Sequence, residues 1–195
     1  GDGSMVHLMN KTIQAKMART AGLNVPREWT FDLSKDIVIP TDMVFPCICK
    51  RMDSETGYES EMAVCEDETE FLEHMNRMRR RMPDREVLVQ EFLHVDHEIN
   101  VSGVCLDQDV IVPGLIRKTH IAKNHVGIAL AGEMISFDRY GDLREKVVSL
   151  LKQFRYVGMF DVELNVVGDK IYFNEVDLRS DIHSDAYLKN GVNLP

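Results

Sequence analysis

The sequence has no long hydrophobic run and no excess of basic residues, and each absence excludes a class of function. No apolar stretch approaches the roughly 20 residues that a membrane-spanning helix needs, and no signal peptide is visible. Acidic residues number 32 against 23 basic ones, which gives a formal net charge of −9. Because a negative surface repels nucleic-acid phosphates, we expect a cytoplasmic globular protein with neither a nucleic-acid nor a membrane partner.

Cysteine is scarce, and its spacing excludes the common metal and redox motifs. There are four cysteines and no CxxC pair. We expect all four to be reduced and mostly packed in the interior, with Cys47 and Cys49 on one face of a strand. A group formed by Asp181, His183 and Asp185 matches no common zinc spacing and is a weak metal candidate.

The motifs of several large enzyme classes are also missing. The sequence contains no GxxxxGK[ST] loop, no GxGxxG, no HExxH and no protein-kinase signature set. No Ser/His/Asp order can be argued from it. The candidate functional residues are therefore the charged residues at the ends of the predicted apolar strands and helices.

Hydrophobic periodicity predicts an α+β fold with antiparallel hairpins and no internal repeat. Helices are expected at 10–21, 67–81 and 143–154, and strands at 37–39, 45–50, 61–65, 86–93, 98–105 and 110–116. An extended connector is expected at 23–31, a turn at 54–60, and an irregular loop at 119–133. The expected divisions are a tag remnant at 1–5, a linker and helix at 6–26, a small lobe at 27–90 and a larger lobe at 91–195.

The most informative stretch is 161–179, which predicts two strands joined by a tight turn at 168–169. Strand alternation places Asp161 and Glu163 on one face, and a short hairpin brings Glu175 and Asp177 close to them. Two carboxylates about 6 Å apart repel by roughly 3 kcal/mol at an effective dielectric constant of about 20. Such a cluster favours a hard divalent cation, magnesium above all, although a solvated polar strand face with surface ion pairs is the alternative.

Arg179 follows this cluster and suits a phosphate oxygen. It closes an ordered series of charged and polar groups at element ends. The series comprises Lys11, Lys50, Gln90-Glu91, Glu98, Arg117-Lys118, Asp161, Glu163, Glu175, Asp177 and Arg179.

In this order and at these separations, the chain resembles the ATP-grasp family of ligases from about residue 10 to residue 195. The most specific segments are 45–50, 87–93 together with Glu98, and 158–179. The resemblance implies a two-lobed ATP-grasp fold with the nucleotide between the lobes, and the small lobe acting as a lid. It also implies ATP and Mg²⁺ as cofactors, with Mn²⁺ able to substitute.

The resemblance implies a role for each residue of the series. Lys11 and Lys50 would reach the ATP phosphates, and Arg117 or Lys118 would help neutralise them. The adenine pocket would be lined by Gln90, Glu91, Phe92 and Leu93, and Glu98 would bind the ribose hydroxyls. The metal ligands would be Glu163 and Glu175 with Asp177 alongside, and Asp161 as a second candidate. Arg179, with Lys50, would act on the phosphate being transferred.

The implied reaction is attack of a small-molecule carboxylate on the γ-phosphate, which gives an acylphosphate that an amine then consumes. Two departures bear on this expectation: Asp177 stands where the family usually has Asn, and the lid loop retains only Gly57. The family's N-terminal lobe is not present, so we expect a piece of a larger ligase whose other lobes are its partners. The alternatives are a non-catalytic nucleotide-binding module and a scaffold domain that binds no nucleotide.

Overall fold

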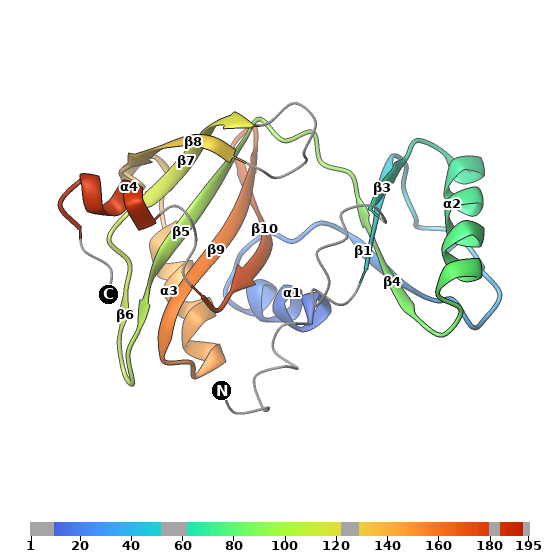
Figure 1. Cartoon of the computed structure of the whole chain (residues 1–195), viewed down its shortest axis with the longest axis horizontal. Coiled ribbons are helices and arrows are strands. Elements are labelled where there is room, and N and C mark those ends of the chain that lie inside the picture. The colour runs from blue at the N-terminus through green and yellow to red at the C-terminus, as the bar shows by residue number, and fades with distance from the viewer. Residues whose placement is uncertain (1–9, 52–61, 122–128, 180–183, 193–195) are drawn as a thin grey trace. The chain divides into compact units, whose positions relative to one another are not determined.

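The computed structural model describes residues 10–51, 62–121, 129–179 and 184–192 of the chain (Figure 1). The chain divides into two compact units. Unit 1 consists of residues 1–12 and 26–94, and unit 2 of residues 13–25 and 95–195. Each unit has its own antiparallel sheet with helices, so the predicted α+β class is confirmed.

Unit 1 is built on a four-stranded antiparallel sheet in the order β1-β4-β2-β3. The strands are β1 (Glu28–Asp32), β2 (Cys47–Arg51), β3 (Ala63–Cys65) and β4 (Glu86–Glu91). Helix α2 (Glu68–Arg81) closes the core of this unit. Strand alternation directs Cys47 and Cys49 of β2, and Val87 and Val89 of β4, into the core beneath α2.

Helix α2 follows the sequence rules for a helix closely. The carboxylate of Asp67 accepts a hydrogen bond from the backbone N–H of Glu70 at 3.0 Å and caps the N-terminus. Phe71, Met75 and Met78 form the buried apolar stripe. Acidic residues in the first turn and arginines in the last turn complement the helix dipole. The prediction of a helix at 67–81 is confirmed.

Unit 2 holds a six-stranded antiparallel sheet in which five strands follow the order β10-β9-β5-β7-β8, and β6 pairs with β5. The strands are β5 (His97–Cys105), β6 (Val110–Ile111), β7 (Leu115–Ile121), β8 (Ala129–Ile135), β9 (Gly158–Val167) and β10 (Lys170–Asp177). The helices are α1 (Lys11–Thr20), which belongs to this unit from residue 13 onward, α3 (Leu143–Phe154), α4 (Ser184–Lys189) and the short η3 (Phe137–Arg139).

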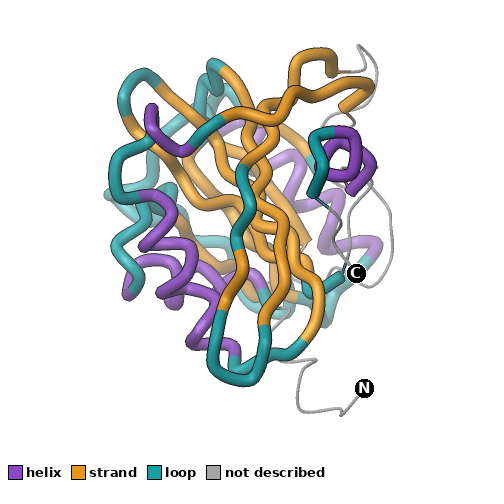
Figure 2. Tube along the Cα trace, turned by 90° about the vertical axis from the view of Figure 1, so that its left-hand side faces the viewer, coloured by secondary structure: helices purple, strands orange, loops and turns teal. Residues whose placement is uncertain are grey.

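The two faces of this sheet differ in character. The apolar face carries Ile99, Val101 and, on β9, Val162 and Leu164, all buried. Helix α3 packs against β5 and β6 through a buried stripe. Helix α4 lies on the side of the sheet opposite α3 (Figure 2). The polar face is therefore the one on the side of α4, and it holds the candidate site.

Three sequence predictions about secondary structure are wrong. No strand forms at 37–39; instead β1 forms at Glu28–Asp32, mostly within the connector expected at 23–31, because β4 supplies its hydrogen-bonding partner. The expected loop at 119–133 contains most of β8, which pairs with β7 despite its small and polar residues. The expected strand 110–116 is split between β6 and β7 at Pro113-Gly114.

Two features named from the sequence fall outside the described residues: the turn at 54–60 and the side chains of 181–185. All four cysteines are free and buried, as expected. Within the described part of the chain, no helix is both long and apolar enough to cross a membrane.

Removal of the α2 cap tests how much this helix depends on Asp67. We expect Asp67→Ala to lower the free energy of unfolding by about 1 kcal/mol, because the N–H of Glu70 loses its acceptor. Urea denaturation followed by circular dichroism measures the change. Asn76→Ala, at an exposed mid-helix position, is the matched control and should not destabilise. Equal destabilisation by both substitutions would contradict the capping role.

Candidate functional site

The β9–β10 hairpin brings two pairs of carboxylates face to face. Glu175 lies opposite Glu163, and Asp177 lies opposite Asp161, in the antiparallel register. The turn falls at 168–169, as predicted, and Gly168 adopts a φ of +59° that favours glycine. Residues directly opposite in an antiparallel pair share one face of the sheet. The predicted proximity of Glu163 and Glu175 is therefore present in the structure.

A break in the hairpin register makes this pairing possible. From Lys170 to Phe173 the register is regular, and it then shifts so that Glu175 rather than Asn174 opposes Glu163. In an unbroken ladder Glu175 would point to the apolar face, because a shift of one residue reverses side-chain direction. The amide of Asn174 donates a hydrogen bond to Glu163 Oε2 at 3.2 Å.

Strands β5 and β7 add to the same face. Asn100 lies opposite Glu163, and Glu98 lies opposite Asn165. From β7, the ammonium of Lys118 donates to Glu98 Oε2 at 2.8 Å and lies 3.6 Å from Glu163 Oε1. The Lys118 side chain is only 3% exposed. We call Glu98, Asp161, Glu163, Glu175 and Asp177, together with Lys118, the acidic face.

The acidic face carries more negative charge than Lys118 neutralises. Burial raises the pKa of the Glu163 carboxyl above its ordinary value, and the charges of Glu175 and Glu98 add to the rise against the opposing effect of Lys118. Burial works to lower the pKa of the Lys118 ammonium, but Glu163 and Glu98 outweigh it, so this pKa is raised. Carboxylate oxygens are the ligands that a hard divalent cation prefers, so Glu163 and Glu175 fit a magnesium ion.

Asp161 has a different environment from Glu163. Its side chain is buried, with 1% exposure, and its two oxygens accept hydrogen bonds from Asn100 Nδ2 and Ser102 Oγ. Behind it, the hydroxyl of Tyr187 from α4 accepts from the N–H of Ser102 and donates to the carbonyl of Gly114. Burial raises the pKa of Tyr187 to about 12. These contacts give Asp161 a structural role, and they leave Glu163 as the better placed of the two for a cation.

The basic residues predicted to bind phosphate in unit 2 have different partners in the structure. Arg179 is exposed and pairs with Asp177 at 2.9 Å. Arg117 pairs with Glu133 on β8. Because consecutive strand residues point to opposite faces, Lys118 lies on the acidic face and Arg117 does not. Of the two predicted phosphate ligands on β7, only Lys118 is grouped with the carboxylates.

In unit 1, Lys50 lies on β2, and the residues predicted for the adenine pocket lie at the end of the neighbouring strand β4 and just after it. Lys50 pairs with Leu88, and Ile48 pairs with Gln90, so Lys50 and Gln90 point to the same face of the sheet. The backbone N–H groups of Glu91 and Phe92 donate to the carbonyls of Arg27 and Pro46. If residues 90–93 pair with the edge of an adenine base, they must therefore use backbone groups other than these two N–H groups. Lys11 is the first residue of α1.

Sequence reasoning missed Asn100, Ser102 and Asn174 as supports of the carboxylates. A signal for the first two was present, because Glu98, Asn100 and Ser102 are polar at every second position of an otherwise apolar strand. The contribution of Tyr187 had no such signal, since it comes from a helix far away in the sequence.

Comparisons with known proteins agree with this architecture. No protein-family model matches the chain. It is 24% identical, over 169 residues, to the carbamoyl phosphate synthase large chain of Lachnoclostridium phytofermentans; the match covers 85% of this chain and 15% of that protein.

The solved structures that are similar over nearly the whole chain include two ligases or synthetases of known name. N5-carboxyaminoimidazole synthetase from Staphylococcus aureus aligns with a TM-score of 0.73 at 16% identity, covering 96% of this chain and 52% of that one. D-alanine–D-alanine ligase from Bacillus anthracis, complexed with ATP, aligns with a TM-score of 0.71 at 17% identity, covering 95% and 61%. The fold of this chain is that of an ATP-grasp domain. The chain spans between about a seventh and about three fifths of the length of these proteins.

The structural role of Asp161 can be separated from a metal-binding role. We expect Asp161→Ala to lower the free energy of unfolding by roughly 2–5 kcal/mol, because two buried donors lose their acceptor. Asp177→Ala is the control and should cost less than about 1 kcal/mol, because its partner Arg179 is exposed. Chemical denaturation measures both. Similar small losses for the two variants would show that Asp161 is not a structural residue.

Proposed function

We propose that the chain binds magnesium–ATP and serves as the nucleotide-binding domain of a ligase that activates a carboxylate for attack by an amine. The observation that carries this proposal is the acidic face, where Glu163 and Glu175 oppose each other beside Lys118 and Glu98. Carboxylates that face one another in this way suit a cation, and hard divalent cations are the ones that bridge carboxylates to phosphates. The ATP-grasp fold, and the ATP in the similar D-alanine–D-alanine ligase, support the nucleotide.

In this proposal Glu163 and Glu175 hold the metal, with Asp177 beside them. The bound Mg²⁺ would supply charge neutralisation at the phosphates. Lys118 holds Glu98 and Glu163 in position through its ion pairs with both carboxylates, and Glu98 accepts hydrogen bonds from the ribose hydroxyls. Because a carboxylate has about four lone-pair sites, Glu98 can bind Lys118 and still accept from a hydroxyl.

The remaining roles belong to the basic residues and to the end of β4. Lys50 and Lys11 donate to phosphate oxygens, and Arg179 leaves its surface pair with Asp177 to hold the transferred phosphoryl group. Gln90, Glu91, Phe92 and Leu93 form the adenine pocket. The chain's share of catalysis would be positioning and charge stabilisation, since phosphoryl transfer needs little covalent chemistry from the protein.

The phosphate role of Lys50 is tested by Lys50→Ala. We expect the Kd for magnesium–ATP, measured by titration calorimetry, to rise at least about tenfold, because a charged hydrogen bond contributes about 1.5–3 kcal/mol. Lys35→Ala is the matched control in the same unit; this exposed lysine pairs with Asp32 and should leave the Kd unchanged. An unaltered Kd in Lys50→Ala would remove this residue from the site.

The metal role of Glu175 is tested by the near-isosteric change Glu175→Gln. The Mg²⁺ concentration that half-saturates ATP binding should rise by about tenfold, the size of one charge-assisted contact. Glu133→Gln, whose carboxylate pairs with Arg117, should not change it. Identical magnesium dependence in Glu175→Gln and the wild-type chain would reject the assignment.

Turnover separates the proposed ligase from a non-catalytic binder. Phosphate release would be measured with a panel of amino acids, as carboxylate and amine donors together, in the presence of magnesium and ATP. Release that depends on the acceptor supports a ligase. Saturable ATP binding without release supports the non-catalytic alternative, and absence of an ATP-dependent shift in Tm would contradict nucleotide binding altogether.

A further inference from the structure

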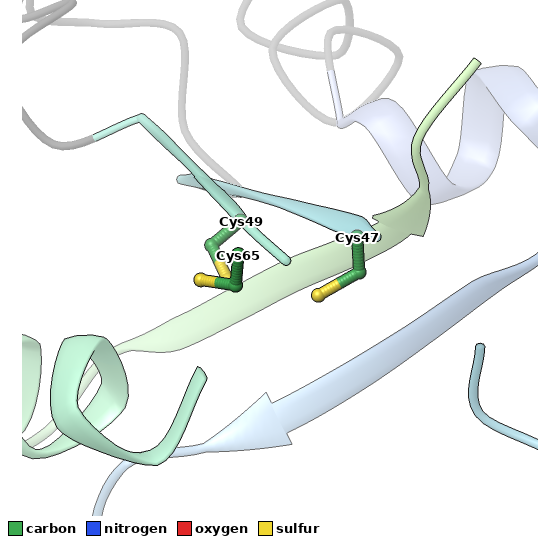
Figure 3. A group of neighbouring side chains, drawn as sticks. All are labelled: Cys47, Cys49 and Cys65. Atoms are coloured by element: carbon green, nitrogen blue, oxygen red, sulfur yellow. The ribbon is translucent and has the colours of Figure 1, made fainter. Parts of the chain in front are cut away.

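Three of the four cysteines meet in the core of unit 1. Cys47 and Cys49 extend from β2 and Cys65 from β3, and their side chains gather in one place (Figure 3). The three sulfur atoms all lie within 4.8 Å of one another. All three thiols are free and at most 1% exposed. The fourth, Cys105, lies on β5 in unit 2.

The register of the sheet produces this convergence. Cys47 lies directly opposite Cys65 in the antiparallel β2–β3 pair, and Cys49 follows two residues later on the same face of β2. The cluster faces the side of the sheet on which α2 packs, among Phe31, Phe71 and Met75. The backbone pairing of β2 with β3 therefore determines the position of the three thiols.

The donor set selects one chemical class of ligand. Thiolates are soft ligands, which prefer thiophilic ions to the hard cations that choose oxygen. Among the described residues, no His, Asp or Glu side chain extends the cluster to a fourth ligand. Three sulfurs placed about 2.3 Å from one metal ion are about 4 Å apart, a separation compatible with three sulfurs that all lie within 4.8 Å of one another.

We propose that Cys47, Cys49 and Cys65 form a binding site for one soft metal ion in three-coordinate geometry, with copper(I) as the ion that matches it best. Structural zinc sites are almost always four-coordinate, whereas copper(I) is stable with three sulfur ligands. Each thiol that binds as a thiolate releases its proton to solvent, and no electron is transferred. The site uses none of the residues proposed for ATP.

Because all three thiols are buried, entry of a metal ion requires local opening at the edge of the sheet. β3 is an edge strand of three residues, and β2 is its neighbour. Edge strands this short open locally at low free-energy cost, which would expose Cys65 and then the two cysteines of β2. Bound metal would join β3 to β2.

The experiment is a titration of the reduced, metal-free chain with copper(I) under anaerobic conditions, in competition with a colorimetric copper(I) chelator. We expect one equivalent to be withdrawn from the chelator. Cys49→Ser should weaken binding by more than about 10-fold, because even the loss of a residue that only supports a metal ligand typically costs about 10-fold in affinity. Cys105→Ser, the matched control, should bind like the wild type. No withdrawal by the wild type, or an equal loss in Cys105→Ser, would mean that the thiols serve only as small apolar core residues.

X-ray absorption on the wild-type copper complex needs no variant and covers the case in which Cys49→Ser fails to fold. Three sulfur ligands at about 2.3 Å are expected. Nitrogen or oxygen ligands would overturn the assignment. A parallel titration with zinc(II) should give weaker binding, and tighter zinc binding would overturn the three-coordinate site.

Discussion

The repulsion between carboxylates on neighbouring strands is the constraint on which the candidate site depends. Glu163 and Glu175 occupy opposing positions of one hairpin, and Glu98 reaches the same face from β5. Like charges placed this close in a partly buried environment destabilise the fold unless positive charge offsets them. The nearly buried Lys118 supplies part of that charge through its contacts with Glu98 and Glu163. The carboxylate oxygens gathered on this face are ligands of the kind that a divalent cation prefers.

The rest of unit 2 positions this face. The apolar side of the sheet packs on the buried stripe of α3 through β5 and β6, and β9 pairs with β5 along its length. Beneath the carboxylates, Asp161 is satisfied by Asn100 and Ser102, and Tyr187 ties that network to α4. This buried network restrains the strands above it, because a shift of either strand would break the hydrogen bonds that the Asp161 carboxylate accepts from Asn100 and Ser102.

Strand β2 gives unit 1 two chemically different faces. Alternation sends Cys47 and Cys49 into the core toward α2, and sends Lys50 to the other face with Gln90 of β4. The proposed nucleotide contacts and the proposed soft-metal site therefore lie on opposite faces of the same strand. Because successive residues of a strand point to opposite faces, a substitution at Lys50 does not redirect the cysteine side chains, and a substitution at a cysteine does not redirect Lys50.

Local pattern in the sequence determined much of this protein. The helices α2 and α3, the hairpin turn at 168–169, the polar faces of β9 and β5, and the paired direction of Cys47 and Cys49 all follow from spacing and capping between near neighbours. Tertiary structure alone decided the rest. The register shift at Asn174 turns Glu175 toward Glu163, β1 and β8 become strands because β4 and β7 offer them partners, and Cys65 joins two cysteines from another strand. Each of these depends on pairing between residues distant in the chain, and such pairing leaves no period in the local sequence.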